Sequence, residues 1–406
     1  MREASVSLLS IDDNKINEIL ESVAQAMVSE QESLLSANAL DLAAMDSSNP
    51  MYDRLLLSAE RIAGIAQDMR KVAELESPVG KLIDSRVRPN GMEIRRVRVP
   101  FGVIGVIYEA RPNVSFDLFS LCLKSRNTCV LKGGSDAYNS NRAIVDLLKR
   151  ELEKCGVDPR VVELLPAGRE AAAELMHAVG LVDVLIPRGS AGLIKAVRQQ
   201  SEVPVIETGA GVCHTFFASD GDLKKGTDVI VNAKTRRVSV CNALDSLVID
   251  SSRLADLKHI CAPMAVKNVV IEADEQAYAA LDGNYPSGLL QHATQESFGK
   301  EFLALRMSVK TVGSFQEGLE HIRRFTSHHS ECIVTEDARK AEIFQTTVDA
   351  ACVYVNVSTA FTDGGQFGLG AEVGISTQKL HARGPMGLEE LTTYKWLING
   401  NGQTRI

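Results

Sequence analysis

Apolar and polar positions alternate with a helical period in the first part of the chain. Leu20, Val23 and Met27 recur every three or four residues, and a similar series runs through residues 55–65. Such a period is typical of amphipathic helices that bury one face. The pattern therefore predicts that residues 12–80 are mainly helical.

The pattern changes to residue-by-residue alternation between residues 82 and 99. Arginines alternate with valines and isoleucines on both sides of Pro89-Asn90-Gly91. Alternation around an Asn-Gly pair predicts a β-hairpin. A hairpin alone is only marginally stable in water, and an exposed strand edge invites pairing with another chain. We therefore expect residues 82–99 to project as an arm that packs against a second copy of the protein.

From residue 100 onward, short apolar runs alternate with helical patterns. This rhythm predicts a doubly wound parallel α/β sheet, with ligands at the carboxyl ends of its strands. In a first series we expect strands at 103–108, 128–132, 161–165, 182–186 and 203–207, and helices at 116–124, 141–155, 170–179 and 191–199. In a second series we expect strands at 245–249, 308–312, 331–334 and 352–355, and helices at 316–325 and 337–347.

These patterns divide the chain into three predicted parts. Residues 1–81 and 100–228 are expected to form a cofactor-binding domain, and residues 229–382 a catalytic domain. Residues 82–99 and 383–406 are expected to form an oligomerisation element, so that the protein is a homo-oligomer. A chain of this length can bury more than one core.

Composition narrows the classes of function. The 406 residues are 45% hydrophobic and carry a net charge of −8. No basic face or tail stands out, which argues against binding to nucleic acid, and no apolar run approaches the length of a transmembrane helix. The N-terminus lacks the pattern of a signal peptide. We therefore expect a cytoplasmic protein that acts on a small molecule and has neither a nucleic-acid nor a membrane partner.

The cysteines and histidines give no support to a metal site. The eight cysteines are scattered, without a Cys-x-x-Cys pair, and the histidines do not accompany them at the spacing of metal ligands. Cysteines of this kind are typical of free thiols in a reducing compartment. We expect no bound metal.

Cys241 is the strongest candidate for a reactive group. It follows Lys234, Arg236 and Arg237 in a polar loop and precedes an apolar run. Basic neighbours favour the thiolate, which is the nucleophilic form of cysteine. The alternative is a small buried hydrophobic side chain, which is the usual role of a free cysteine. Cys213, in a Gly-Val context, is interpreted as such a packing residue.

Two predicted strand ends carry glycines that suit phosphate binding. The candidate residues are Lys132, Gly133, Gly134 and Ser135 in one loop, and Arg188, Gly189 and Ser190 in the other. Each loop opens a helix, whose free N–H groups and positive dipole end suit a pyrophosphate, and the cationic side chains add charged hydrogen bonds. Neither loop has the dinucleotide-binding or Walker pattern, so ordinary glycine capping is the alternative for each.

The chain resembles the aldehyde dehydrogenase superfamily and, within it, the branch that reduces gamma-glutamyl phosphate. The matching stretches are residues 100–113, 185–193, 211–214, 231–235, 361–372 and 376–387. The run 378–387 is specific to that branch, and the resemblance covers nearly the whole chain. It implies an aldehyde dehydrogenase-like fold of two doubly wound α/β domains. The implied activity is NADPH-dependent reduction of L-glutamyl 5-phosphate to L-glutamate 5-semialdehyde and phosphate, the second step of proline biosynthesis from glutamate.

The resemblance also implies roles for single residues. Cys241 would form a thioester, and its backbone N–H and the Asn113 amide would stabilise the oxyanions, although Asn113 also suits a turn. Glu207 matches the general base of the superfamily. A reductase needs no activated water, so Glu207 is left to hold the cofactor or position the thiol. Glu301 opens a Glu-Phe pair that resembles the ribose-binding element for the nicotinamide cofactor.

The substrate that the resemblance implies carries a carboxylate and a phosphate, so its site requires cations. Ala360 stands where the branch is expected to have an arginine. Arg111, Arg237 and Arg383 are the candidates to bind substrate, because arginine binds both groups in bidentate fashion. For Arg383 the alternative is a structural tie of the C-terminal segment.

Two other functions stay open at this point. An acylating aldehyde dehydrogenase would use the same thioester with coenzyme A, but the branch-specific run argues against it. A catalytically silent homologue would act as a scaffold, but the candidate nucleophile and both glycine loops argue against that. The sequence does not decide the number of subunits, the preference for NADPH over NADH, or whether glutamate 5-kinase is a partner.

Overall fold

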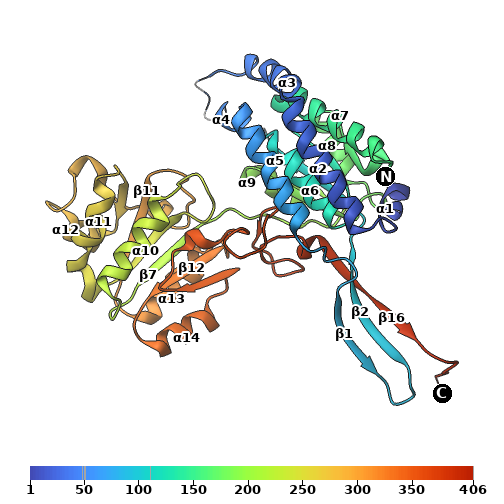
Figure 1. Cartoon of the computed structure of the whole chain (residues 1–406). Helices are drawn as coiled ribbons and strands as arrows, with labels where there is room; N and C mark the ends of the chain where they lie inside the picture. The colour runs from blue at the N-terminus through green and yellow to red at the C-terminus, as the bar shows by residue number, and fades with distance from the viewer. Residues whose placement is uncertain (48, 50–51, 110, 406) are drawn as a thin grey trace. The chain divides into compact units, whose positions relative to one another are not determined.

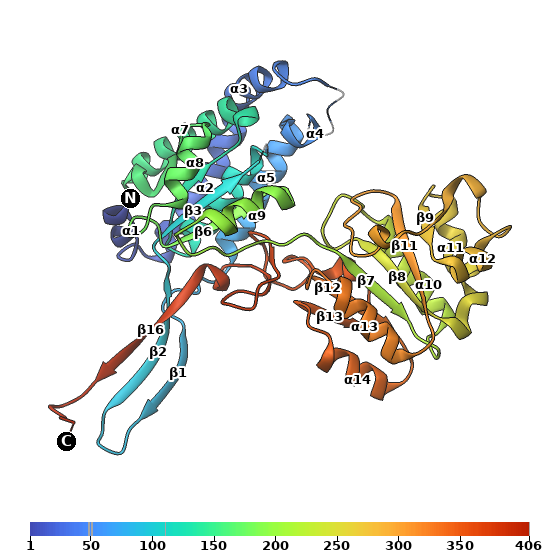
Figure 2. The same cartoon turned by 180° about the vertical axis from the view of Figure 1, so that it is seen from behind.

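The apolar runs of the chain fold into buried parallel sheets (Figures 1 and 2). The computed structural model describes residues 1–47, 49, 52–109 and 111–405. Within these residues the chain divides into two units. The first comprises Met1–Thr208, Gly368–Gly374 and Met386–Ile406, and the second comprises Gly209–Phe367 and Ile375–Pro385.

Amphipathic helices open the first unit, as the helical period predicts. They are α1 (Arg2–Leu8), α2 (Asp13–Ser29), α3 (Gln31–Ala43), α4 (Tyr52–Leu55) and α5 (Ala59–Glu74). Side chains cap two of them, because Asp12 accepts from a backbone N–H of α2 and Ser58 from one of α5. Helix α2 packs against α5 through fully buried residues such as Ile16 and Leu20.

The first sheet has the strand order β5-β4-β3-β6, and neighbouring strands pair in parallel. Its elements are β3 (Val103–Tyr108), α6 (Asn113–Lys124), β4 (Thr128–Lys132), α7 (Tyr138–Lys154), β5 (Val162–Leu164), α8 (Arg169–Met176), β6 (Val184–Arg188) and α9 (Ala191–Gln200). Every residue of β3 and β4 is buried, which explains the continuous apolar sequence of β3 and the apolar centre of β4. The order of the strands reverses between β3 and β6, and the carboxyl ends at such a point are where parallel sheets bind ligands.

The prediction of a strand at 203–207 is wrong. An isolated bridge joins Val205 to Leu185 instead. The N–H of Leu185 donates to the carbonyl oxygen of Pro204, and that of Ile206 donates back to Leu185. Proline has no N–H with which to extend the ladder, so the pairing ends after one bridge.

The predicted hairpin is present and extends away from the helices of its unit (Figure 1). Strand β1 (Leu82–Val87) pairs antiparallel with β2 (Glu93–Pro100), and β16 (Thr392–Asn399) covers the other edge of β2. The sequence analysis did not predict β16. Its Tyr394 and Trp396 rings lie 5.0 and 5.3 Å from the guanidinium of Arg96. We call β1, β2 and β16 the hairpin sheet.

The second unit contains a parallel sheet with the order β10-β9-β11-β8-β7-β12-β13, here called the second sheet. Its elements are β7 (Cys213–Phe217), α10 (Leu223–Thr235), β8 (Leu244–Asp250), α11 (Leu257–Ala265), β9 (Val270–Ala273), α12 (Glu275–Leu281), β10 (Leu290–His292), β11 (Arg306–Val312), α13 (Phe315–Phe325), β12 (Ser330–Val334), α14 (Ala338–Thr347) and β13 (Cys352–Val355). A short pair, β14 (Ile375–Ser376) and β15 (Gly384–Pro385), follows. Because β7 lies inside this sheet, the units divide after residue 208, earlier than the predicted boundary after residue 228.

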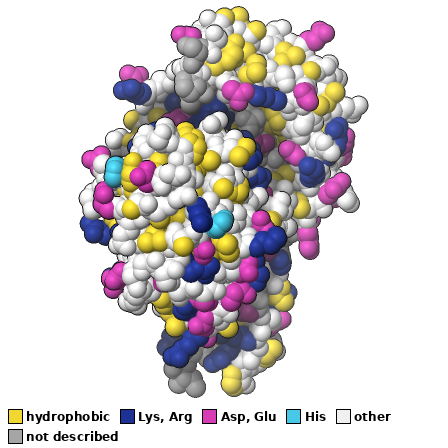
Figure 3. Space-filling model, turned by 90° about the vertical axis from the view of Figure 1, so that its left-hand side faces the viewer, with side chains coloured by type: hydrophobic (Ala, Val, Ile, Leu, Met, Phe, Trp, Pro, Cys, Tyr) yellow, Lys and Arg dark blue, Asp and Glu magenta, His cyan; other side chains and the backbone are white. Residues whose placement is uncertain are grey.

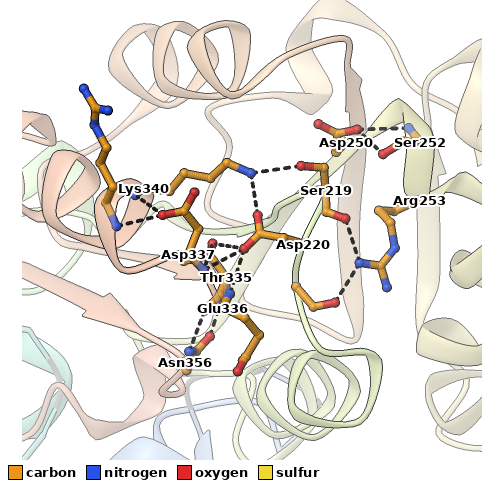
Figure 4. A network of polar contacts seen from close by, with 12 residues as sticks. Ser219, Asp220, Asp250, Ser252, Arg253, Thr335, Glu336, Asp337, Lys340 and Asn356 are labelled. Atoms are coloured by element: carbon orange, nitrogen blue, oxygen red, sulfur yellow. Dashed lines mark hydrogen bonds and ion pairs between the residues drawn. The ribbon is translucent and has the colours of Figure 1, made fainter.

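Polar contacts join the carboxyl ends of β7 and β12 (Figure 4). The carboxylate of Asp220 accepts hydrogen bonds from the Thr335 hydroxyl at 2.6 Å, from the Glu336 and Asp337 N–H groups at 2.8 Å, and from the Lys340 ammonium at 2.5 Å. Each partner offers a donor to the same carboxylate. At this edge of the second sheet the charge of Asp220 is therefore compensated by several hydrogen-bond donors.

The surface shows no large region of one charge on the face in Figure 3, where Lys and Arg are interspersed with Asp and Glu. In the part of the chain that the structure describes, no helix is both long and apolar enough to cross a membrane. Nor do these residues contain a group of three or more His, Cys, Asp and Glu side chains that is arranged to hold a metal ion.

Candidate active site

Cys241 lies in the turn between α10 and β8, at the amino edge of the second sheet. Its side chain is partly exposed, and the neighbouring Arg236 and Arg237 at the end of α10 are exposed. A partly exposed thiol on an ordered turn is open to a substrate, whereas a cysteine that only fills a core would be enclosed.

Lys234 does not belong to the exposed loop, and this part of the prediction is wrong. Its side chain, in the last turn of α10, is fully buried. The ammonium donates to the carbonyl oxygen of Leu244 at 2.6 Å and lies 3.9 Å from the carboxylate of Asp245. Burial lowers the pKa of Lys234 and raises the pKa of Asp245 to about 7, while each charge opposes the shift of the other. The helix carries Lys234 inward, so the exposed basic residues beside the turn are the two arginines.

The carbonyl group of Cys241 is held by the segment that leads into β7. The thiol of Cys213 donates to the Cys241 carbonyl oxygen at 3.2 Å. The Cα atom of Gly211 packs against the same carbonyl, and a Cβ there would overlap its oxygen. The N–H of Gly211 in turn donates to the carboxylate of Glu301 at 3.0 Å. Burial raises the pKa of Glu301, and the Gly211 N–H opposes the rise.

Asn242 anchors the other side of the turn. Its amide donates to the carbonyl oxygen of Thr362 at 2.9 Å and to that of Ala360 at 3.4 Å. The backbone carbonyl oxygen of Asn242 accepts a hydrogen bond from the Thr359 hydroxyl at 2.8 Å. Ala360, where an arginine was expected, is 7% exposed. Ala360 is thus a small, enclosed residue at the position where an arginine was expected, and its backbone carbonyl oxygen contacts the turn through Asn242.

The first glycine loop follows β4. Burial lowers the pKa of Lys132, whose ammonium donates to the carbonyl oxygen of Gly133 at 2.8 Å. A Cβ at Gly133 would overlap the side-chain amide of Asn141, so this glycine permits close packing of α7. Gly134 is half-buried and Ser135 is exposed. Packing accounts for the first glycine, while Gly134 and Ser135 face outward and are open to a ligand.

The second glycine loop, with Arg188, follows β6 and opens α9. A carboxylate occupies this helix N-terminus, because Glu109 accepts from the Ser190 N–H at 2.9 Å and from the Ser190 hydroxyl at 2.7 Å. A Cβ at Gly189 would stand 2.7 Å from the carboxyl carbon of Glu109. The end of α9 therefore binds an anion, as such helix ends do, and here the anion belongs to the chain itself.

Asn113 begins α6, and its amide donates to the carboxylate of Asp117 at 3.1 Å, one turn further on. Burial raises the pKa of Asp117 to about 6, and this hydrogen bond opposes the rise. The amide expected to stabilise an oxyanion is thus paired within its own helix. The nearby Arg111 is partly exposed.

The remaining predicted residues contact charged neighbours. The carboxylate oxygens of Glu207 lie 3.4 and 3.5 Å from the guanidinium of Arg198. The guanidinium of Arg383 lies 2.7 Å from the carboxylate of Asp349. Lys379 and Arg383 together hold the pKa of Asp349 below its usual value. This pairing fits the structural alternative for Arg383 better than a role reserved for substrate.

Comparison with known proteins identifies the family. The sequence pattern of the aldehyde dehydrogenase family matches residues 2–278. A gamma-glutamyl phosphate reductase of Bacteroides thetaiotaomicron is 61% identical over 405 residues, which cover 100% of this chain and 97% of that protein. The crystal structure of the gamma-glutamyl phosphate reductase of Thermotoga maritima matches with a TM-score of 0.95 at 40% identity, covering 100% of this chain and 98% of that one. The chain belongs to the aldehyde dehydrogenase family.

Within the aldehyde dehydrogenase family, the chain is an oxidoreductase of the gamma-glutamyl phosphate reductase branch. The predicted aldehyde dehydrogenase-like α/β fold is confirmed. An acetylating aldehyde dehydrogenase of Geobacillus thermoglucosidasius, at 17% identity, matches with a TM-score of 0.70 over 100% of this chain and 96% of that one, and this likeness concerns the fold.

Sequence reasoning missed several residues that contact the predicted site residues. Glu109 stands inside one of the matching stretches, directly after a strand, and that position was the available signal. Cys213 was interpreted as packing, and Asp245 looked like part of an apolar strand. Their contacts join residues far apart in the chain, 81 positions for Glu109 and Ser190 and 116 for Cys213 and His329. No local pattern reports such contacts.

Proposed function

We propose that this protein reduces L-glutamyl 5-phosphate with NADPH, giving L-glutamate 5-semialdehyde and phosphate, through a thioester on Cys241. The observation that carries the proposal is a partly exposed thiol on a turn that is anchored on both sides. The names of full-length relatives at 61% and 59% identity support the choice of substrate. In this proposal the product, L-glutamate 5-semialdehyde, is an intermediate of proline biosynthesis.

The chain's own residues supply the covalent steps. The Cys241 thiolate attacks the acyl carbon, a C–S bond forms, and the C–O bond to phosphate breaks as phosphate leaves. After reduction of the thioester, the C–S bond breaks while the aldehyde carbonyl forms, and the thiolate is regained. The backbone N–H of Cys241 is the first proposed oxyanion donor and the Asn113 amide the second, since that amide has two N–H groups and donates one of them to Asp117. Arg237 and Arg111 are the proposed cations for the substrate.

The first unit offers residues that fit a nicotinamide cofactor. The end of α9 already binds a carboxylate, with no room for a Cβ at Gly189, so a cofactor phosphate fits there if Glu109 moves away. Gly134 and Ser135 form the other proposed contact, and Glu207 stays a proposed cofactor ligand. Glu301, in the second unit, stays one as well. When bound, NADPH supplies the hydride that reduces the thioester.

A spectrophotometric assay at 340 nm tests the proposed reaction in reverse. The protein should reduce NADP⁺ when both glutamate 5-semialdehyde and phosphate are present, and should not when phosphate is omitted. A rate with coenzyme A in place of phosphate would support the acylating alternative. No rate with either acceptor would support the silent homologue.

Binding of NADPH, followed by its fluorescence, tests the end of α9 without turnover. Glu109→Ala should tighten NADPH binding about threefold or more, because a competing carboxylate no longer occupies the Ser190 N–H. Glu153→Ala is the matched control, since Glu153 is an exposed carboxylate near the carboxyl end of α7, outside both glycine loops. Equal effects of the two variants would show a general loss of negative charge instead of competition at α9.

We also propose that the hairpin sheet joins copies of the protein into a homo-oligomer. Leu82, Val87, Trp396 and Ile398 are 53%, 70%, 42% and 59% exposed in one chain. Apolar side chains on an open sheet are typical of an edge that a partner covers. Deletion of residues 84–97 should give a smaller particle by light scattering, and a wild-type monomer at micromolar concentration would exclude the proposal.

A further inference from the structure

The proposed reaction needs the Cys241 thiol and N–H in one orientation, and the structure shows which groups provide it. The carbonyl oxygen of Cys241 accepts a hydrogen bond from the Cys213 thiol. The next residue, Asn242, is hydrogen-bonded to the segment 359–362. Both contacts act on the backbone and leave the Cys241 side chain partly exposed. The turn is thus fixed without enclosing the thiol.

Cys213 is rigid enough to act as a fixed donor. It is the first residue of β7, fully buried, in a strand that pairs on both sides with β8 and β12. Burial raises the pKa of Cys213 well above its usual value, and the charges of Asp245 and Glu331 raise it further. The sulfur therefore keeps its proton and stays a donor.

The contact cannot easily be replaced by another arrangement of the turn. Gly211 packs so closely on the Cys241 carbonyl that no side chain fits between them. The Glu301 carboxylate holds the N–H of Gly211 at 3.0 Å, and the Ser327 hydroxyl holds that of Val212 at 2.8 Å. The segment that carries Cys213 is therefore itself anchored, and it transmits that order to the nucleophile.

We propose that Cys213 is a positioning residue for the nucleophile: its S–H fixes the peptide that follows Cys241 and thereby orients the reactive thiol and its N–H. The proposal rests on the proposed role of Cys241. It differs from the packing role that the sequence suggested, because packing requires only volume, whereas positioning requires a hydrogen-bond donor at this sulfur.

Three variants distinguish a hydrogen-bonding role of Cys213 from a role in packing alone. Cys213→Ala removes the donor, and Cys213→Ser keeps one. Cys332→Ala is the matched control, because Cys332 is an equally buried cysteine on the adjacent β12 whose thiol donates to a backbone carbonyl, that of Val357, at 3.1 Å. Each variant is measured for kcat, for KM of the semialdehyde, for melting temperature, and for alkylation of Cys241 by iodoacetamide, located by mass spectrometry.

The two kinetic readouts should move in opposite directions in Cys213→Ala. We expect kcat to fall about tenfold with KM nearly unchanged, the size expected for loss of one hydrogen bond to the backbone that orients the nucleophile. Alkylation of Cys241 should become about threefold faster or more, because a small reagent needs access to the thiol and gains from a loosened turn. Cys213→Ser should restore both values to within about threefold of wild type.

A merely structural role predicts a different result. In that case Cys213→Ala and Cys332→Ala lower the melting temperature alike and leave Cys241 alkylation unchanged, and the proposal is overturned. It is also overturned if Cys213→Ser behaves like Cys213→Ala. Alkylation needs no substrate, so this readout stands even if the proposed reaction fails. If the alanine variant does not fold, Cys213→Val, which fills the site without a donor, takes its place.

Discussion

The pKa values of carboxyl groups are shifted in opposite directions at the two edges of the second sheet. At the carboxyl edge, burial alone would raise the pKa of Asp220, but Lys340, Thr335 and two backbone N–H groups outweigh it and hold the pKa well below its usual value (Figure 4). At the amino edge, around Cys241, burial prevails and raises the pKa values of Asp245 and Glu301. One edge thus stabilises charge, and the other favours neutral forms.

The difference follows from what each edge does. Donors that surround a carboxylate lower its free energy in the folded state and strengthen the fold. Ionisable groups that burial shifts without full compensation cost folding free energy, and they gather beside reactive centres. We infer that the carboxyl edge contributes mainly to stability and the amino edge mainly to chemistry.

The largest expected effect is at the amino edge. Cys241→Ser should lower turnover at least about a thousandfold, because a serine hydroxyl is barely ionised near neutral pH and forms no thioester. The melting temperature should stay within about a degree of wild type, since the side chain is partly exposed. Cys155→Ser, at another partly exposed cysteine, is the control. Turnover of Cys241→Ser within tenfold of wild type would refute the nucleophile.

The second prediction concerns the carboxyl edge. Asp220→Asn should lower the free energy of unfolding by about 2 kcal/mol, because the amide presents an N–H group to donors that need an acceptor. Turnover of the remaining folded protein should be unchanged. Asp228→Asn removes a pair on the exposed face of α10 and should cost almost nothing. A loss of turnover without a loss of stability in Asp220→Asn would reverse the roles of the edges.

Acid should weaken the Asp220 contribution. Its folded pKa lies below the unfolded value of about 3.9, so the stabilisation is complete above that value and is lost as the pH falls through the folded pKa. The difference in unfolding free energy between wild type and Asp220→Asn should therefore shrink below about pH 4. Urea unfolding at several pH values measures this difference, and a difference that grows in acid contradicts the assignment.

The last prediction, at Asp245, has the opposite sign of pH dependence. The folded pKa of Asp245, about 7, lies above the unfolded value. Its stabilisation is therefore complete below about pH 4 and is lost as the pH rises toward 7. Asp245→Asn should remove this loss, so that the difference in unfolding free energy shifts toward the variant by up to about 4 kcal/mol between pH 4 and pH 8, at about 1.4 kcal/mol for each pK unit. The same slope in both proteins would show that Asp245 is not shifted.

Much of the fold was predictable from local pattern. A buried parallel strand such as β3 stands out as a continuous apolar run, because helices cover both faces of such sheets. The hairpin was visible in its alternation and its Asn-Gly turn. The place of Cys241, between a basic loop and a strand, was also evident. The prediction of a strand at 203–207 failed because it gave more weight to the apolar run than to Pro204 inside it, and a proline counts against a strand.

Other features were decided by the tertiary structure alone. The sequence by itself determined most of the elements, the family and the candidate nucleophile. It did not determine that Lys234 turns inward, that Glu109 caps α9, or that Cys213 donates to the carbonyl of Cys241. Periodicity reports which face of one element is buried, whereas these contacts depend on which strands become neighbours. Strand order follows from crossover connections and the packing of whole helices, so groups that meet at a strand end carry no mark of each other in the sequence.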